Sequence, residues 1–556
     1  MSGGGDLLGI ATGGLQAFQQ ALSTTGNNIA NVNTDGYSRE SVNLTTQVPV
    51  ATGAGFIGTG VEVTGVTRSY NQFVAEQVRS STSANASLQT YASLAGNVSN
   101  LLGDSSAGLS PALQSFFNAV QGVASNPTDP SARQVMLSQG QTLASRFNYL
   151  NQQLSDQRKQ LNGQLSDAVS QINSLAKSIA EVNQKIVNAT GQAGGQPPNT
   201  LLDQRDTLLN KLSQQVSVST VTQSDGSVNV FIGKGQPLVT EFSAGTLSYT
   251  AAPAPGMQPA VSFSSSGSST KVPVTNNISG GNLGGMLSFW GQVLTPAQSS
   301  LDQLAASVAT KFNAQHVKGM TLNGTPGGDF FSASPTVSPS IANSGGATVS
   351  AAYDPSTVSQ LGASSYTLTY NGSNSWTLTP SGGKPTTLSG SGPFTVDGMN
   401  ISVSGTPSAN DQYSINTNAS KNIGVAIQDP ANIAAAAPVV AGNTSSNTGS
   451  ATLSNLAVTD PTNTALKDQV SISFTSPTQY NVTDTTTGTT LATGVAYTSG
   501  NSVSYNGWTA SLQGTPAAGD NFTVGPNTSG VGDNRNALAL AGLQDALTMD
   551  GGTSSF

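Results

Sequence analysis

The chain has no cysteine and only one histidine among its 556 residues. The lack of cysteine excludes disulfides, thiolate metal sites and cysteine nucleophiles, and it leaves the redox compartment undetermined. Charged residues make up only 8% of the chain, against about a quarter in an average globular protein. The net charge of −8 argues against a protein that binds nucleic acid or an anionic membrane.

Long apolar runs are also missing. No stretch of roughly 18 apolar residues occurs, so we expect no membrane-spanning segment. The amino terminus has no basic region, and glycine and glutamine interrupt its apolar residues, so we expect no cleaved signal peptide. If the protein is exported, it therefore needs another route.

The single histidine limits the catalytic possibilities. A Ser/His/Asp triad or a zinc site would depend on His316, which lies in a predicted helix in the string FNAQHVKG. The 27 acidic residues do not exclude a paired-carboxylate glycosidase by number, but no local motif supports one. We interpret His316 as a hydrogen-bonded packing residue. For the whole chain we expect no enzyme activity, no cofactor and no metal site.

A heptad pattern is the clearest feature that is present. Residues seven apart, and companions three positions after three of them, form one apolar row: Leu8, Leu15, Leu22 and Ile29 with Ala11, Phe18 and Val32. This spacing predicts a helix with a narrow seam like a coiled-coil strand. No charged residue lies between Asp6 and Asp35, so charge pairing does not select its partners. Periodicity alone equally allows an amphipathic helix at a domain edge.

The string that follows the seam identifies its class. GNNIANVNTDGYSRE, residues 26–40, contains Asn28, Asn31, Gly36 and Tyr37. Asparagine and glycine accept left-handed backbone geometry, so the helix is predicted to end near residues 31–33. This string resembles the amino-terminal signature of flagellar axial proteins, which comprise rod, hook and hook-associated proteins. The block GVEVTGVTRSYNQFVAEQVR, residues 60–79, resembles the second signature of the same proteins.

A glycine motif near this block has two interpretations. GAGFIG, residues 53–58, formally fits the dinucleotide-binding pattern G-x-G-x-x-G. That pattern requires a strand before it and a helix after it, whereas here a predicted strand follows. We therefore favour a β-turn over a phosphate-binding loop.

From residue 68 onward, the chain alternates between helical and β patterns. Helical periodicity is predicted in four segments: 68–125, 129–188, 201–216 and 294–317. Period-two patterns from residue 217 to about 274, with an Asp225-Gly226 turn, predict a β-domain. Gly140 and Gly163 are possible breaks in the long second helix. A short final helix is expected at 534–548.

Residues 340–528 contain a diverged repeat. Matching elements recur 104 to 109 positions apart, including Gly405-Thr406-Pro407 with Gly514-Thr515-Pro516, and the string from Asp411 to Ile415 with that from Asp520 to Val524. The repeat predicts two β-domains or two halves of one. The linker at 429–438 is either a short helix or an extended spacer.

Two late strings narrow the resemblance. FNAQHVKGMTLNGTPGGDFF, residues 312–331, and SGVGDNRNALALAGLQ, residues 529–544, resemble the family of the first flagellar hook-associated protein, at the hook–filament junction. The resemblance implies an extracellular subunit exported by the flagellar type III apparatus. The implied partners are copies of the chain, the hook protein and, towards the filament, hook-associated protein 3. The family continues into a carboxy-terminal heptad helix, which this sequence is expected to lack.

We therefore predict a multi-domain α+β protein, an elongated coiled-coil-like helical shaft carrying inserted all-β domains. The expected domains are the axial helix 1–36, a shaft of 37–216, 290–335 and 529–556, a first β-domain at 217–289, and repeat units at 340–438 and 439–528. The expected assembly residues are Leu8, Leu15, Phe18, Leu22, Ile29, Asn28, Asn31, Gly36 and Tyr37.

The function that we predict is that of a structural junction subunit that assembles through its terminal helices. Another axial protein of the hook or rod is one alternative. The other is a secreted adhesin that binds a ligand through the β-repeat at 340–528.

Overall fold

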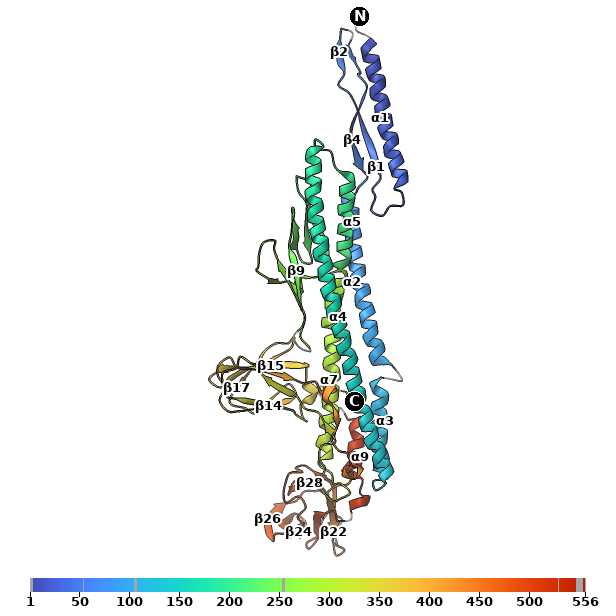
Figure 1. The fold of residues 1–556 in the computed structure, drawn as a ribbon. Helices are drawn as coiled ribbons and strands as arrows, with labels where there is room; N and C mark the ends of the chain where they lie inside the picture. Colours follow the sequence, from blue (N-terminus) through green and yellow to red (C-terminus); the bar gives the residue numbers. More distant parts are fainter. Residues whose placement is uncertain are drawn as a thin grey trace. The chain divides into compact units, whose positions relative to one another are not determined.

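The computed structural model describes residues 4–53, 55–104, 108–252, 256–528, 530–546 and 554–555 (Figure 1). The chain divides into two compact units. The first comprises Met1–Val98, Gln157–Pro253 and Gln258–Leu294. The second comprises Ser99–Asp156, Ala254–Met257 and Thr295–Phe556.

Helices supply most of both units outside the β-sheets. Their bounds are α1 (Gly4–Ala30), α2 (Gln72–Gly103), α3 (Leu109–Ser125), α4 (Pro130–Gln192), α5 (Asn199–Gln215), α6 (Gly281–Phe289), α7 (Thr295–His316), α8 (Ala419–Asn422) and α9 (Arg535–Ala541). The long predicted helix is continuous as α4. The segment predicted at 68–125 forms two helices, α2 and α3, instead of one. The helix predicted at 534–548 is the shorter α9, and the last two positions of that prediction lie outside the described residues.

Gly140 has a packing role within α4. A Cβ atom there would lie 2.9 Å from Cε1 of Phe330, so the glycine makes room for an aromatic ring. Phe330 belongs to a cluster of phenylalanines in the second unit, where its ring centroid lies 4.8 Å from that of Phe331 and 5.1 Å from that of Phe312. The helix stays unbroken because its own hydrogen bonds offset the low helix propensity of one glycine.

Besides its helices and the strands before residue 72, the first unit contains two small sheets between residues 218 and 273. One has the order β5-β6-β7-β8 and the other β11-β10-β9. Their bounds are β5 (Val218–Thr222), β6 (Val228–Ile232), β7 (Gln236–Thr240), β8 (Ser243–Ala244), β9 (Thr246–Thr250), β10 (Ala260–Ser264) and β11 (Val272–Pro273). The predicted turn joins β5 to β6. There Gly226 has φ +86°, and the carboxylate of Asp225 accepts a hydrogen bond from the Ser227 amide at 2.9 Å.

Helix α6 and the π-helical turn η2 (Trp290–Leu294) that follows it were not predicted from the sequence. Their string GGNLGGMLSFW is typical of a turn by composition. Its glycines instead permit close helix packing, because a Cβ at Gly281 would lie 2.1 Å from the Gln215 carbonyl carbon, and one at Gly285 would lie 2.4 Å from the Ser87 oxygen.

In the second unit the repeat forms two sets of strands. The first set is β13 (Thr336–Pro339), β14 (Thr348–Tyr353), β15 (Ser365–Gly372), β16 (Ser375–Pro380), β17 (Thr386–Ser389), β18 (Phe394–Val396), β19 (Met399–Ser404) and β20 (Gln412–Asn416). The second is β22 (Val439–Asn443), β23 (Thr452–Val458), β24 (Val470–Ser476), β25 (Gln479–Asp484), β26 (Thr489–Ala496), β27 (Ser502–Tyr505), β28 (Trp508–Gln513) and β29 (Asn521–Pro526).

Both sets have the same topology. The five-stranded sheets have the orders β13-β20-β15-β16-β17 and β22-β29-β24-β25-β26, and the three-stranded sheets β14-β19-β18 and β23-β28-β27. A carboxylate recurs as well. Asp411 accepts hydrogen bonds from the amides of Ser408 and Ser344, and Asp520 accepts them from those of Ala517 and Thr448. The repeat therefore consists of two copies of one strand arrangement.

The segment between the two sets is mostly extended. It contains a short strand, β21 (Gly424–Val425), paired with β12 (Phe331–Ser332), and a 3-10 turn, η4 (Pro430–Asn432). Ala436 then forms a bridge with Met320. The helix α8 and strand β21 precede the linker at 429–438, which itself combines the turn η4 with an extended spacer. The linker packs beside the end of α7 in the second unit.

Candidate functional site

Helix α1 has two different faces. One packs on an antiparallel ribbon of β1 (Glu40–Thr46) and β4 (Val61–Arg68), which continues as the hairpin of β2 (Val50–Thr52) and β3 (Gly55–Ile57) (Figure 1). Ala17 on this face is only 2% exposed. A Cβ atom at Gly13 would lie 3.5 Å from the Val61 oxygen, so helix and ribbon are in van der Waals contact.

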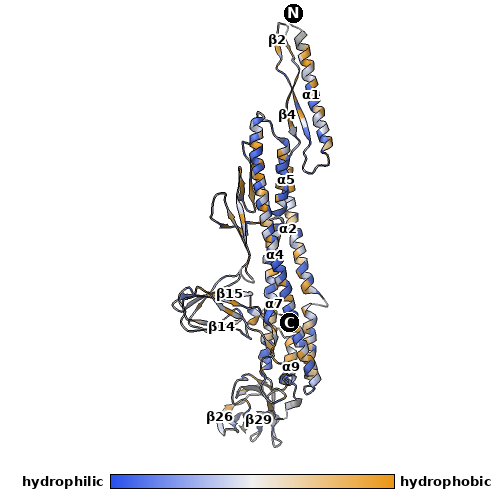
Figure 2. Ribbon diagram, in the orientation of Figure 1, coloured by the Kyte–Doolittle hydropathy of each residue, from blue (hydrophilic) through white to orange (hydrophobic). Residues whose placement is uncertain are grey.

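The predicted seam lies on the other face. Its side chains are exposed: Leu8, Leu15, Phe18, Leu22, Ile29 and Val32. Leu22 is 74% exposed, and the informative feature is that the whole row is exposed rather than any one leucine. Apolar residues recur along α1 (Figure 2). A helix that buries a row of small residues and exposes a row of large ones has an interaction surface that the described part of this chain does not cover.

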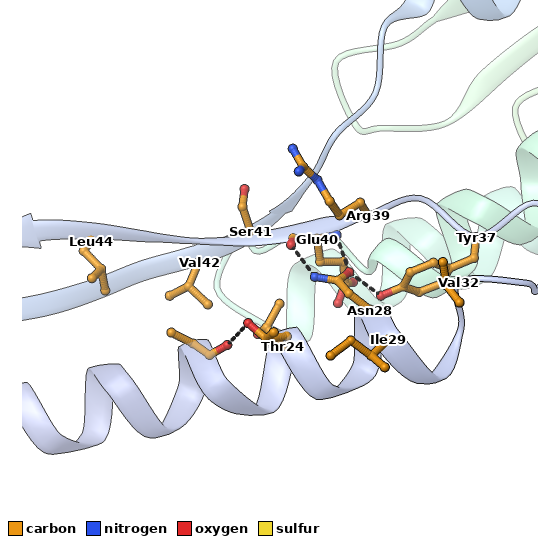
Figure 3. A pocket seen from close by; sticks show the side chains of 12 residues that line it. Thr24, Asn28, Ile29, Val32, Tyr37, Arg39, Glu40, Ser41, Val42 and Leu44 are labelled. Carbon is orange, nitrogen blue, oxygen red and sulfur yellow. Dashed lines mark hydrogen bonds between the residues drawn. The ribbon is translucent and has the colours of Figure 1, made fainter.

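Asn28 fixes the start of β1 against the end of α1 (Figure 3). Its side-chain amide donates a hydrogen bond to the Glu40 carbonyl at 2.9 Å. Its Oδ1 accepts one from the Glu40 amide at 2.8 Å and another from the Tyr37 hydroxyl at 2.8 Å. The side chain thereby acts as a neighbouring strand would, and it pairs both backbone groups of the first residue in β1.

The helix ends in a network of asparagines. Asn31 donates to the Oδ1 atom of Asn27 at 2.9 Å, and Asn27 donates to the Tyr37 hydroxyl at 3.3 Å. Burial raises the pKa of Tyr37, and the charges of Glu40 and Asp203 act in the same direction, so the phenol remains a hydrogen-bond donor. The structure therefore brings three predicted residues together, Asn28, Asn31 and Tyr37.

Gly36 lies where the chain turns from α1 toward β1. Its φ is +81°, a region that L side chains rarely adopt. A Cβ atom at this position would lie 2.2 Å from the Oγ1 atom of Thr207 on α5. Both the backbone conformation and the close contact therefore require glycine.

We expect Gly36→Ala to loosen the turn between α1 and β1. The left-handed backbone costs about 1–2 kcal/mol with an alanine, and the contact with Thr207 adds strain. Hydrogen exchange of peptides covering residues 27–46 should become faster. Gly26→Ala is the matched control, because no atom lies within 4 Å of its Cβ position and helical alanine gains roughly 0.5–1 kcal/mol over glycine. Equal exchange in both variants would contradict the assigned role of Gly36.

Ion pairs that were not predicted from the sequence join the ribbon to α5. Arg68 pairs with Asp203 at 2.9 Å and with Asp206 at 2.5 Å, and all three side chains are largely buried. Asp203 also accepts a hydrogen bond from the Ser38 amide at 2.9 Å. The partners are more than 130 positions apart in the chain, so no local spacing reveals them. The only available signal was the place of Arg68 inside the second signature block.

An apolar groove lies beside the carboxy-terminal half of the seam. It has a volume of about 710 Å³ and lies between α1 and β1 (Figure 3). Ile29 and Val32 line it from the helix side and Val42 and Leu44 from the strand side. The groove therefore extends the apolar surface of the seam onto the ribbon.

Other possible sites have structural explanations. GAGFIG contributes to the hairpin of β2 and β3, and strand β4 follows it, so the turn interpretation is confirmed. His316 is fully buried, with Nδ1 2.6 Å from the Gly328 oxygen and Nε2 accepting from the Ala434 amide at 2.9 Å, as a packing residue would be. Within the described ranges, no three histidine or acidic side chains gather in a potential metal site. In the same ranges, every helix is too short or too polar to cross a membrane.

Comparison with known proteins gives matches along most of the chain. Residues 95–331 match the family described as the flagellar hook-associated protein FlgK helical domain. Residues 340–417 match the flagellar hook-associated protein 1 D2-like domain, and residues 8–37 match the flagella basal body rod protein family.

Relatives cover similar lengths. Flagellar hook-associated protein 1 of Escherichia coli (strain K12) is 32% identical over 457 residues, which is 80% of this chain and 82% of that protein. Its counterpart in Salmonella typhimurium is 34% identical, and the match covers 77% of this chain and 78% of that protein. The structure of the flagellar hook junction protein FlgK from Burkholderia pseudomallei is similar with a TM-score of 0.71 and 33% identity, covering 86% of this chain and 92% of that one. The chain belongs to the flagellar hook-associated protein 1 family.

Proposed function

We propose that this chain joins the hook of the bacterial flagellum to its filament by packing the exposed seam of α1 against neighbouring subunits. Membership of the hook-associated protein 1 family makes it a structural protein of the external flagellum, at the hook–filament junction. The site residues of this proposal are Leu8, Leu15, Phe18, Leu22 and Ile29, held in place by Asn28, Asn31, Gly36 and Tyr37.

The exposed seam is the observation that carries the proposal. Full burial of one leucine side chain contributes about 1.5–3 kcal/mol, so a row of such residues offers a substantial driving force for association. Because the chain has no charged residue from position 7 to position 34, burial of either flank of the seam leaves no charge unpaired. The groove beside Ile29 provides a second apolar surface for the same purpose.

We propose specific partners in addition. The proposed contacts are copies of this chain at the sides, the hook protein below and hook-associated protein 3 toward the filament. We also propose export through the flagellar type III apparatus without a cleaved leader. Family membership and the uncharged seam support these assignments.

A strain lacking the gene tests the junction role. We expect electron microscopy to show bare hooks, and we expect monomeric flagellin in the culture medium, with both defects reversed by the full gene. Normal filaments in the deletion strain would contradict the proposal.

The same strain separates the junction role from ligand binding by the β-repeat. The family comparisons do not favour the adhesin alternative. A gene without residues 340–528 should restore filaments if the repeat is not needed for assembly. If the filaments are restored but the cells no longer adhere to surfaces, the repeat has a binding role besides assembly.

A further inference from the structure

A cluster of arginines lies in the first unit, behind the join of Arg68 to α5. Arg79 on α2 is 3% exposed and Arg205 on α5 is 6% exposed. Together with Arg68 they line a small cavity of about 40 Å³. On a comparable measure a cavity needs roughly 10–15 Å³ to hold one water molecule, so this cavity holds a water-sized or slightly larger occupant.

The positive charges in the cluster are incompletely matched. Arg68 takes both carboxylates, those of Asp203 and Asp206. Arg205 donates to uncharged oxygens, at 2.7 Å to the Gly226 carbonyl. Three guanidinium groups thus face two carboxylates, and the cluster carries one excess positive charge.

Arg79 is the group that the protein leaves unpaired. Its buried Nη1 atom has no hydrogen-bond partner among the residues that the structure describes, and neither has Nε of Arg205. The nearest acidic residue on its own helix, Glu76, is exposed and accepts a hydrogen bond from Gln72 at 2.9 Å. A buried ion without a partner costs several kcal/mol, which an anion in the cavity would offset.

The remaining lining suits a small anion. Asp206 lines the cavity, but its carboxylate is already paired with Arg68. Thr220 and Thr222 of β5 offer hydroxyl groups, which donate to anions. Thr222 and Gln72 are exposed, so solvent ions have access. Burial lowers the pKa of Arg205, and the charge of Asp206 raises it. The positive charges of Arg68 and Arg79 lower it further, as expected for guanidinium groups close to one another.

We propose that this cavity binds one small inorganic anion of halide size, held by Arg79 and Arg205 next to the Arg68 join. This assignment is independent of the junction role. Because the site lies where α2, α5, β4 and β5 meet, the bound anion neutralises the cluster that connects the ribbon to α5.

Bromide is the direct probe of the site. Crystals of the full chain grown in sodium bromide should show an anomalous difference peak in the cavity, within hydrogen-bonding reach of the Arg79 guanidinium. The midpoint of thermal unfolding should rise with the logarithm of bromide concentration, relative to gluconate at equal ionic strength.

Variants assign the effect to the site. Arg79→Met should remove both the anomalous peak and the bromide dependence. Lys185→Gln is the matched control, since it removes one exposed positive charge of the same unit and should keep both responses. A cavity that contains only water in the wild-type crystals would overturn the proposal, even if Arg79→Met does not fold. Equal bromide responses of wild type and Arg79→Met would overturn it as well.

Discussion

An aspartate at position 22 is expected to abolish junction assembly while both units of the chain stay folded. Leu22 is 74% exposed in the described structure, so Leu22→Asp removes little burial within the chain. In the proposed assembly it removes about 2 kcal/mol of apolar burial and places an unpaired carboxylate in the interface, at a cost of several kcal/mol. Because each 1.4 kcal/mol is tenfold in affinity, association should weaken roughly a thousandfold or more.

Motility and filament counts in the deletion strain measure this effect. The strain complemented with Leu22→Asp should show bare hooks and secrete a chain with an unchanged circular dichroism spectrum. Gln20→Asp is the matched control, because it places the same charge on the same helix at an exposed position outside the seam. Normal filaments with Leu22→Asp, or bare hooks with Gln20→Asp, would contradict the assignment of the seam.

Loss of the single histidine is expected to have the largest effect on stability. The imidazole of His316 donates from Nδ1 to the Gly328 carbonyl and accepts at Nε2 from the Ala434 amide, which fixes one neutral tautomer. His316→Ala leaves a cavity and two buried backbone groups without partners. We expect it to lower the free energy of unfolding by about 3–5 kcal/mol.

The same contacts make stability depend on pH. Burial lowers the pKa of His316 to about 4, from 6.5 in the unfolded chain. The unfolded chain therefore takes up a proton first as the pH falls. The stabilising contribution of the neutral imidazole is complete above pH 6.5, and about 3 kcal/mol of it is lost on going down to pH 4.

Urea unfolding between pH 4 and 7.5, followed by the helical circular dichroism signal, tests this dependence. Burial raises the pKa of Asp302, so this carboxyl group makes the folded chain more stable as the pH falls, opposite to His316. The effect of the histidine must therefore be measured as a difference between two proteins. His316→Gln carries no titrating group and keeps Asp302, so wild type minus variant should isolate the histidine. Parallel pH profiles for the two proteins would show that His316 does not titrate as described.

Local patterns of the sequence predicted much of the fold. The heptad spacing of α1, the asparagine-rich end of that helix and the Asp225-Gly226 turn each depend on residues a few positions apart. The repeat predicted two related β-domains or two halves of one, and only the structure showed that both copies share one strand order. Such features are determined by backbone preferences and by one buried face, and both are visible in a short window.

Long-range packing was not predictable in this way. The glycine-rich string of α6 favours a turn by local preference, and only its contacts with Gln215 and Ser87 make a helix the better solution. The join of Arg68 to Asp203 unites residues that are 135 positions apart. The seam was visible in the sequence, but that its leucines are exposed while Ala17 is buried required the structure.

Thiol labelling at position 22 tests the central claim most directly. The chain has no cysteine, so Leu22→Cys and Gln20→Cys each create a single reactive site. We expect a maleimide to label both secreted monomers rapidly. In isolated flagella, position 22 should become protected while position 20 stays more reactive. Equal labelling rates of Leu22→Cys in the monomer and in the assembled flagellum would show that the seam is not buried in the junction.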